Sequence, residues 1–92
     1  MTDLDTRRRK LAFRASRRGF REMDLFMEAF ASRHLAGFDA RDLDEFEALL
    51  DVPDQTVYAW IIGSEAPPLE SRSRVLDLVL AFRYPAPSKP RT

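Results

Sequence analysis

Residues 17–24, with the sequence RRGFREMD, carry the side chains best suited to recognition chemistry in this chain. Arg18 offers a planar fork of N–H donors that fits a carboxylate or backbone carbonyls. Glu22 is an acceptor for a basic or amide partner. Gly19 has no side chain, so the backbone of a partner could approach closely at this position. Arg18, Gly19 and Glu22, spaced as R-G-x-x-E, could therefore form a docking surface for a partner.

The same residues also have a purely structural interpretation. Arg18 and Glu22 are four positions apart, a spacing that gives a helix-surface ion pair worth at most about 0.5 kcal/mol. Gly19 could end a preceding helix as a left-handed C-terminal cap. On these residues alone, the structural interpretation is favoured.

Catalytic and metal chemistry find little support in the sequence. The chain has one histidine, His34, and no cysteine, and its serines lie in no nucleophile-elbow pattern. No glycine-rich phosphate loop is present. His34 falls at the end of an expected helix, where the helix dipole favours a cation, and this structural role is favoured over metal ligation. We expect no catalytic residue, no metal site and no enzymatic activity.

The charges are unevenly distributed along a chain whose formal net charge is zero. Residues 7–21 hold eight basic side chains and no acid, whereas acids dominate residues 22–51. The basic segment, with Phe13 and Phe20, could bind phosphates and stack on bases. Zero net charge and the absence of a helix-turn-helix or RNP signature argue against this. A small nucleic-acid-binding domain remains the alternative, and an antitoxin-like or structural module ranks third.

Length and composition predict one small domain. No apolar run reaches the roughly 18 residues that a membrane span needs, so we expect no membrane partner. The first ten residues lack the apolar stretch of a secretory signal and carry two aspartates, which argues against secretory and mitochondrial targeting alike. The absence of cysteine fits a reducing compartment. We therefore expect a cytoplasmic protein.

The elements that would position these residues are helices. Apolar spacing predicts five of them, over about residues 4–17, 21–34, 40–51, 52–62 and 69–83. Asp39 and Asp51 are expected to cap the third and fourth helices, and Gly63 to end the fourth. The fold class is thus all-α, a compact five-helix bundle with short loops. We expect residues 1–84 to form the domain and the Pro-rich residues 85–92 to be a disordered tail.

The expected core consists of the apolar stripes of these helices. The residues assigned to it are Leu4, Leu11, Ala15, Met23, Phe26, Met27, Phe30, Leu43, Phe46, Leu49, Leu50, Val57, Ile61, Val75, Leu76, Val79 and Phe82. Trp60 lies on the same face as Val57 and is interpreted first as a core residue, with a contact to a partner as the lesser alternative.

Beyond its local chemistry, the sequence resembles a known family. RRGFREMD at residues 17–24 and FEALLDVPDQTVYAWIIG at 46–63, on a short five-helix chain, closely resemble the SdhE family of succinate dehydrogenase assembly factors. The resemblance covers about residues 10–82. The family's R-G-x-x-E motif is filled by Arg18, Gly19 and Glu22, preceded by Arg17 and followed by Asp24. Met23 stands where relatives often have leucine, a volume-conserving change.

The resemblance implies a helper protein and not an enzyme. Family members promote covalent attachment of FAD to a histidine of the succinate dehydrogenase flavoprotein subunit, and in bacteria also of the fumarate reductase flavoprotein subunit. The flavin belongs to the client, and no cofactor is held stably by the helper. The R-G-x-x-E surface faces the client. The expected partner-binding residues are Arg17, Arg18, Gly19, Arg21, Glu22 and Asp24, with Trp60 as the lesser candidate. The chain is expected to be a monomer when free.

Overall fold

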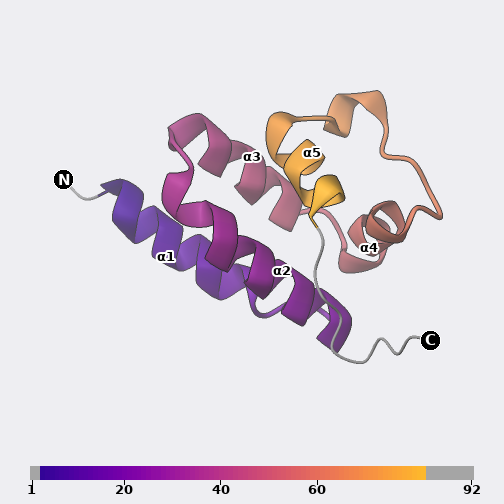
Figure 1. The fold of residues 1–92 in the computed structure, drawn as a ribbon, viewed down its shortest axis with the longest axis horizontal. Coiled ribbons are helices and arrows are strands. Elements are labelled where there is room, and N and C mark those ends of the chain that lie inside the picture. Colours follow the sequence, from indigo (N-terminus) through magenta and orange to yellow (C-terminus); the bar gives the residue numbers. More distant parts are fainter. Residues whose placement is uncertain (1–2, 83–92) are drawn as a thin grey trace.

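A computed structural model describes residues 3–82 of the chain. They form five α helices, which are α1 (Asp3–Ala15), α2 (Arg21–His34), α3 (Ala40–Leu50), α4 (Asp54–Ile62) and α5 (Arg74–Ala81). Two short 3-10 helices, Leu35–Gly37 and Leu69–Ser71, lie in the connections. No strand occurs within the described range. The predicted all-α, five-helix architecture is confirmed (Figure 1).

The helices pack in a continuous chain of contacts. α1 lies beside α2, and α3 packs on both α1 and α5 (Figure 1). α4 packs on α5. The connections before α2, α3 and α4 are short, whereas residues 63–73 form a longer excursion between α4 and α5. Because the turn between α3 and α4 is only three residues, 51–53, the start of α4 stays close to the end of α3.

The start of α3 and the ends of α2 and α4 follow the sequence closely. α2 begins and ends where its apolar spacing predicts. Asp39 caps α3 by accepting the Asp42 N–H at 2.9 Å, and the Asp42 carboxylate accepts the Asp39 N–H in return. Gly63 ends α4 with a φ of 84°, in the left-handed region. These three features are confirmed.

Three other predicted helix ends are wrong. α1 ends at Ala15 and not at residue 17. The N-cap of α4 is Pro53, while Asp51 lies at the C-terminus of α3, where its carboxylate pairs with Arg14 at 2.9 Å. α5 begins only at Arg74, because the Ser73 hydroxyl accepts the Leu76 N–H at 3.0 Å and starts the helix there.

The core is formed by the apolar stripes of all five helices. Phe30 of α2 and Phe46 of α3 are fully buried, as are Leu43 and Val79. Replacing either phenylalanine by alanine would be expected to cost about 3–5 kcal/mol of stability. Leu4, by contrast, is 37% exposed, so the prediction that it belongs to the core is wrong.

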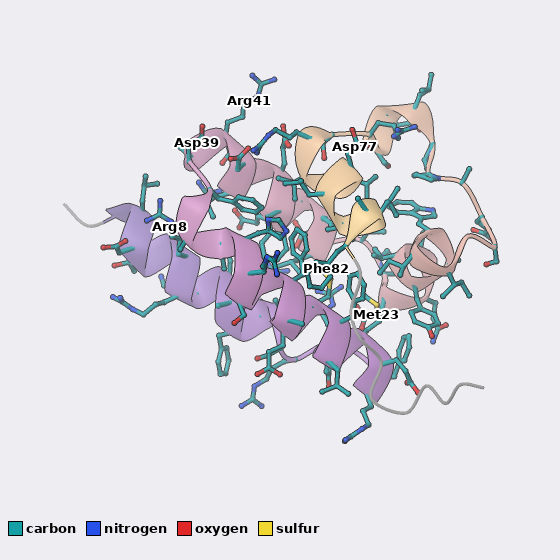
Figure 2. The ribbon with its side chains drawn as sticks, viewed as in Figure 1. Arg8, Met23, Asp39, Arg41, Asp77 and Phe82 are labelled. Atoms are coloured by element: carbon teal, nitrogen blue, oxygen red, sulfur yellow. The ribbon has the colours of Figure 1, made fainter. Side chains whose placement is uncertain are left out.

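An aromatic cluster fills the space between α2, α3 and the end of α5. The Phe30 ring lies 5.8 Å from the Phe46 ring and 5.5 Å from the Phe82 ring, the latter edge-on. Phe82 follows α5 and lies against α2 (Figure 2). The His34 ring joins this cluster, with its centroid 4.6 Å from that of Phe30. His34 therefore serves as an aromatic packing residue.

This packing changes the charge state expected of His34. Burial lowers its pKa, and the nearby positive charges of Arg33 and Arg74 lower the pKa further. The neutral imidazole is therefore favoured in the folded protein. The cation that the end of α2 was expected to stabilise is disfavoured instead, because burial and the charges of Arg33 and Arg74 act against it.

The expectations about the C-terminal tail and about membrane spans can be compared with residues 3–82 only in part. The Pro-rich tail and the domain boundary at residue 84 lie outside residues 3–82. Within those residues, none of the helices combines the length and apolar character required to cross a membrane.

The packing of His34 predicts how stability depends on pH. The pKa of His34 is lower in the folded chain than in the unfolded chain, where it lies near about 6.5. The unfolded chain therefore takes up the proton first, so the free energy of unfolding should be full above about pH 6.5 and fall as the pH drops toward the folded pKa. Urea unfolding between about pH 7 and about pH 5.5 measures this loss.

A substitution isolates the contribution of this side chain. His34 is the only histidine, so His34→Gln should flatten the pH dependence in that window. An unchanged slope in His34→Gln would show that another group is responsible.

Candidate functional site

The candidate site is built around residues 16–20, which connect α1 to α2 and which we call the arginine–glycine turn. α1 ends as the Ser16 hydroxyl donates to the Phe13 carbonyl at 2.9 Å and the Arg17 N–H to the Arg14 carbonyl at 3.1 Å. The chain then leaves the helical conformation at Arg18. α2 begins two residues after Gly19, so the motif spans a turn and the first turn of a helix.

Arg18 points into the molecule. Its side chain is 8% exposed and forms an ion pair with the Asp54 carboxylate. Its Nη1 donates to the Leu50 carbonyl at 3.0 Å, and its Nη2 donates to the Val52 carbonyl at 3.3 Å. Arg18 therefore ties the arginine–glycine turn to the end of α3 and the start of α4.

The predicted pair between Arg18 and Glu22 is absent from residues 3–82. Arg18 precedes the first residue of α2, so the two side chains do not lie one turn apart on a common helix. The i,i+4 rule does not apply across such a break. Asp54 takes the place that Glu22 was expected to occupy.

The Arg18–Asp54 pair is expected to be important for stability, because Arg18 is buried. A buried guanidinium loses its hydration, and here the Asp54 carboxylate and two backbone carbonyls replace most of it. Within the described chain its Nε has no hydrogen-bond partner. Removing Asp54 would leave a buried charge unpaired, at a cost of about 3–5 kcal/mol.

Gly19 is held by the same carboxylate. Its N–H donates to Oδ2 of Asp54. The predicted left-handed cap at Gly19 is wrong, because Gly63 is the glycine with a positive φ in the described part of the chain. A Cβ atom at position 19 would lie 2.5 Å from Oδ2 of Asp54, so a side chain there would require the Asp54 carboxylate to move.

Asp24 and Phe20 complete the inner side of the turn. The carboxylate of Asp24, in the first turn of α2, accepts the backbone N–H of Arg18. The Phe20 ring lies edge-on to the Tyr58 ring of α4, with 5.1 Å between centroids. Asp24 was predicted as a rim residue for a partner, and the structure places its carboxylate within the turn.

The outer side of the turn carries Arg17, Arg21 and Glu22, all exposed. The Arg17 guanidinium lies over the Phe13 ring, 4.5 Å from its centroid, and Phe13 itself is 60% exposed. No ion pair within residues 3–82 involves Arg17, Arg21 or Glu22. The predicted site is thus divided into an inner set that shapes the turn and an outer set that faces solvent.

Trp60 is buried and does not belong to this outer set. It is 6% exposed and borders a hollow of about 230 Å³ between α3 and the start of α5, together with Leu49 and Leu76. This burial supports the interpretation of Trp60 as a core residue.

Part of the basic segment of α1 forms ion pairs with acids of α3 and its C-terminus. Arg7 donates to Asp44 at 2.7 Å and to Glu47 at 2.9 Å, and these hydrogen bonds raise its pKa. Arg14 pairs with Asp51. Because these acids of α3 and its C-terminus compensate part of α1, the cationic surface left for a nucleic acid is smaller than the sequence indicates.

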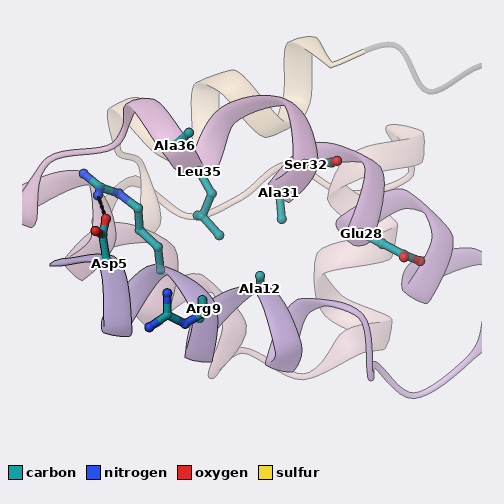
Figure 3. A pocket seen from close by; sticks show the side chains of 9 residues that line it. Asp5, Arg9, Ala12, Glu28, Ala31, Ser32, Leu35 and Ala36 are labelled. Carbon is teal, nitrogen blue, oxygen red and sulfur yellow. Dashed lines mark hydrogen bonds and ion pairs between the residues drawn. The ribbon is translucent and has the colours of Figure 1, made fainter. Parts of the chain in front are cut away.

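A second candidate, a hollow of about 370 Å³ between α1 and α2, carries little chemistry (Figure 3). Ala12 and Ala31 face each other across it, and Arg9 and Glu28 lie at its rim. Within the described residues, no group of three or more histidine, cysteine, aspartate or glutamate side chains could hold a metal ion. The arginine–glycine turn remains the better candidate.

Sequence reasoning missed Asp54. The segment DVPDQ contains two aspartates flanking Val52 and Pro53, and the cap was assigned to the first of them. The available signal was an acid directly after Pro53, at the start of a predicted helix, but only the fold shows that Arg18 is its partner.

Comparisons with known proteins match the whole region of the site. A family model described as "flavinator of succinate dehydrogenase" matches residues 9–83. A succinate dehydrogenase assembly factor 2 from Debaryomyces hansenii is 36% identical over 80 residues, covering 83% of this chain and 56% of that protein. One from Meyerozyma guilliermondii is 30% identical over 88 residues, covering 95% of this chain and 65% of that protein.

These relatives correct the expected cellular location, and they are longer than this chain. Each of them is named as a mitochondrial protein, which contradicts the cytoplasmic location expected from the sequence. The composition and the first ten residues were therefore poor guides to location. The chain spans 56% and 65% of the length of these two relatives.

The matched range, residues 9–83, agrees with the extent of about residues 10–82 that the resemblance indicated. It includes the arginine–glycine turn, Glu22 in the first turn of α2, and Asp54 at the start of α4. The chain belongs to the family of succinate dehydrogenase assembly factors.

Proposed function

We propose that this protein binds the immature flavoprotein subunit of succinate dehydrogenase and promotes covalent attachment of FAD to a histidine of that subunit. Family membership supports the class of client. The observation that carries the docking site is the exposed set Arg17, Arg21 and Glu22, held around a turn whose base is the buried Arg18. The flavoprotein subunit of fumarate reductase is a second client of the same chemistry.

The outer residues suit an interface with a charged partner. Arg17 and Arg21 present cationic donors, and Glu22 presents an anionic acceptor one residue further on. None of these three forms an ion pair within residues 3–82, so each can pair with a client without first breaking a salt bridge, although Arg17 also lies over the Phe13 ring. The buried Arg18 and its partners keep the backbone of the turn in place, which reduces the entropy lost on binding.

The proposed mechanism is one of orientation. The assembly factor holds the domains of the open flavoprotein so that the acceptor histidine lies against the flavin methyl group. Favourable positioning of two reacting groups can lower a barrier by several kcal/mol, up to roughly 7–11 kcal/mol. The factor supplies binding and position, while the covalent bond forms between groups of the client and its own FAD.

The side chains of this protein are consistent with a non-catalytic role. The chain contains no cysteine, and the imidazole of its one histidine packs on Phe30. The proposal therefore assigns no nucleophile or general base to this chain. FAD is bound by the client and not held stably by the factor.

Co-expression tests this function directly. The chain, produced together with a succinate dehydrogenase flavoprotein subunit, should increase the covalent flavin of that subunit, measured as flavin fluorescence of the denatured band in a gel. A client variant without the acceptor histidine provides the control and should show no signal. Equal flavin with and without the factor would contradict the proposal.

Charge reversal tests the docking surface. Arg21→Glu and Glu22→Lys should each weaken client binding by about tenfold or more, because an attractive pair becomes a repulsive one. The melting temperature should change by less than about 4 °C, since exposed charges contribute little to stability. Binding is measured by titration of the apo flavoprotein.

A matched control is available on the same helix. Glu28 is also exposed on α2 but lies six residues further along, toward the hollow beside α1. Glu28→Lys should leave client binding within about twofold of the unaltered chain. Equal losses for Glu28→Lys and Glu22→Lys would indicate a general charge effect and would argue against a local docking site.

A further inference from the structure

Both oxygens of the Asp54 carboxylate are used by consecutive residues of the arginine–glycine turn. Oδ1 pairs with the guanidinium of Arg18, and Oδ2 accepts the N–H of Gly19. The Asp54 side chain is 19% exposed and belongs to the first residue of α4. One carboxylate thus links the connection before α2 to the start of α4.

The space around Gly19 is set by this carboxylate. A Cβ atom at position 19 would lie 2.5 Å from Oδ2, 3.4 Å from Cγ and 3.7 Å from Cβ of Asp54. These three nearest atoms all belong to the same side chain. The backbone at Gly19 is outside the left-handed region, so the conformation does not demand glycine. The close approach of the Asp54 carboxylate is what favours glycine at position 19.

Asp54 cannot easily turn away from an added methyl group. Its other oxygen is paired with Arg18, and Arg18 is itself held by the carbonyls of Leu50 and Val52. Moving the carboxylate would break the Gly19 hydrogen bond and disturb the pair with a buried cation. The steric and electrostatic costs therefore fall on the same group.

We propose that Asp54 is a positioning residue for client docking, and that position 19 must be glycine because of Asp54 in the free protein and not because of a partner. Arg18 and Gly19 belong to the support of the turn, and Arg17, Arg21 and Glu22 are its contacts. The docking role rests on the proposed function; the reason for the glycine does not.

A double-mutant cycle on the free protein tests the reason for the glycine. Gly19→Ala alone should lower the melting temperature by at least about 5 °C, through the clash with Asp54. In an Asp54→Ala background the same change should be neutral or should raise the melting temperature by about 2–6 °C, because alanine restricts the unfolded chain and has nothing left to meet. The sign of the effect should therefore change.

Two further backgrounds keep the cycle decisive. Asp54→Ala leaves Arg18 buried without its carboxylate and could prevent folding, so the cycle is repeated in Arg18→Met/Asp54→Ala, which leaves no unpaired charge. Asp51→Ala removes the exposed carboxylate that pairs with Arg14, three residues before Asp54. In that control background, Gly19→Ala should cost as much as in the unaltered chain. An equal cost in all backgrounds would overturn the proposal.

Client titration separates the docking role from the fold. Asp54→Ala should weaken binding to the apo flavoprotein by about tenfold or more at a temperature where the variant is folded. Adding Gly19→Ala to that background should change the affinity by less than about twofold. If the alanine still abolishes binding there, the glycine serves the partner and the proposal fails. Failure of the unaltered chain to bind would overturn the proposed function and the docking role together, while the stability cycle would still decide why position 19 is glycine.

Discussion

The structure depends on a positive charge placed where little water reaches it. The guanidinium of Arg18 lies at the meeting point of two connections, and its acceptors come from the end of α3, the following turn and the start of α4. Such a charge is tolerated only when its partners are fixed in space. The position of α4 relative to the turn between α1 and α2 is therefore set by hydrogen-bond geometry as well as by apolar packing. Of the motif residues, Arg18 and Gly19 form this contact with Asp54, whereas Glu22 faces solvent.

A second organising feature is the division of charge on α1. The side facing α3 is neutralised by the acids of that helix, so the strongly basic N-terminal segment and the acidic middle of the chain are parts of one internal arrangement. Phe13 of α1, with the guanidinium of Arg17 from the following turn over its ring, remains in contact with solvent. A linear count of charge cannot distinguish these two sides, because successive residues of a helix point in different directions. This is why the basic segment suggested nucleic-acid binding more strongly than the fold does.

Much of the fold could be predicted because it depends on local order. The stripe of Met23, Phe26 and Phe30 predicted both ends of α2 correctly. The reciprocal cap of α3 involves only Asp39 and Asp42, which are three positions apart in the sequence. The errors arose where distant segments meet. The roles of Arg18 and Gly19 were assigned from neighbours in the chain, whereas their shared partner is Asp54. The His34 ring likewise meets the ring of Phe82, which follows α5. Spacing identifies which residues share a helix face, but it does not say which carboxylate a buried arginine will find.

The contact between Gly19 and Asp54 joins positions that are 35 residues apart in the sequence. Because the space one of them leaves is filled by the other, the two positions form a single unit for evolutionary change. A chain that acquires a side chain at the first position must shorten or lose the carboxylate at the second, and must then find another way to neutralise the arginine. If each step alone is harmful, as the proposal predicts, the three residues are expected to change together in evolution.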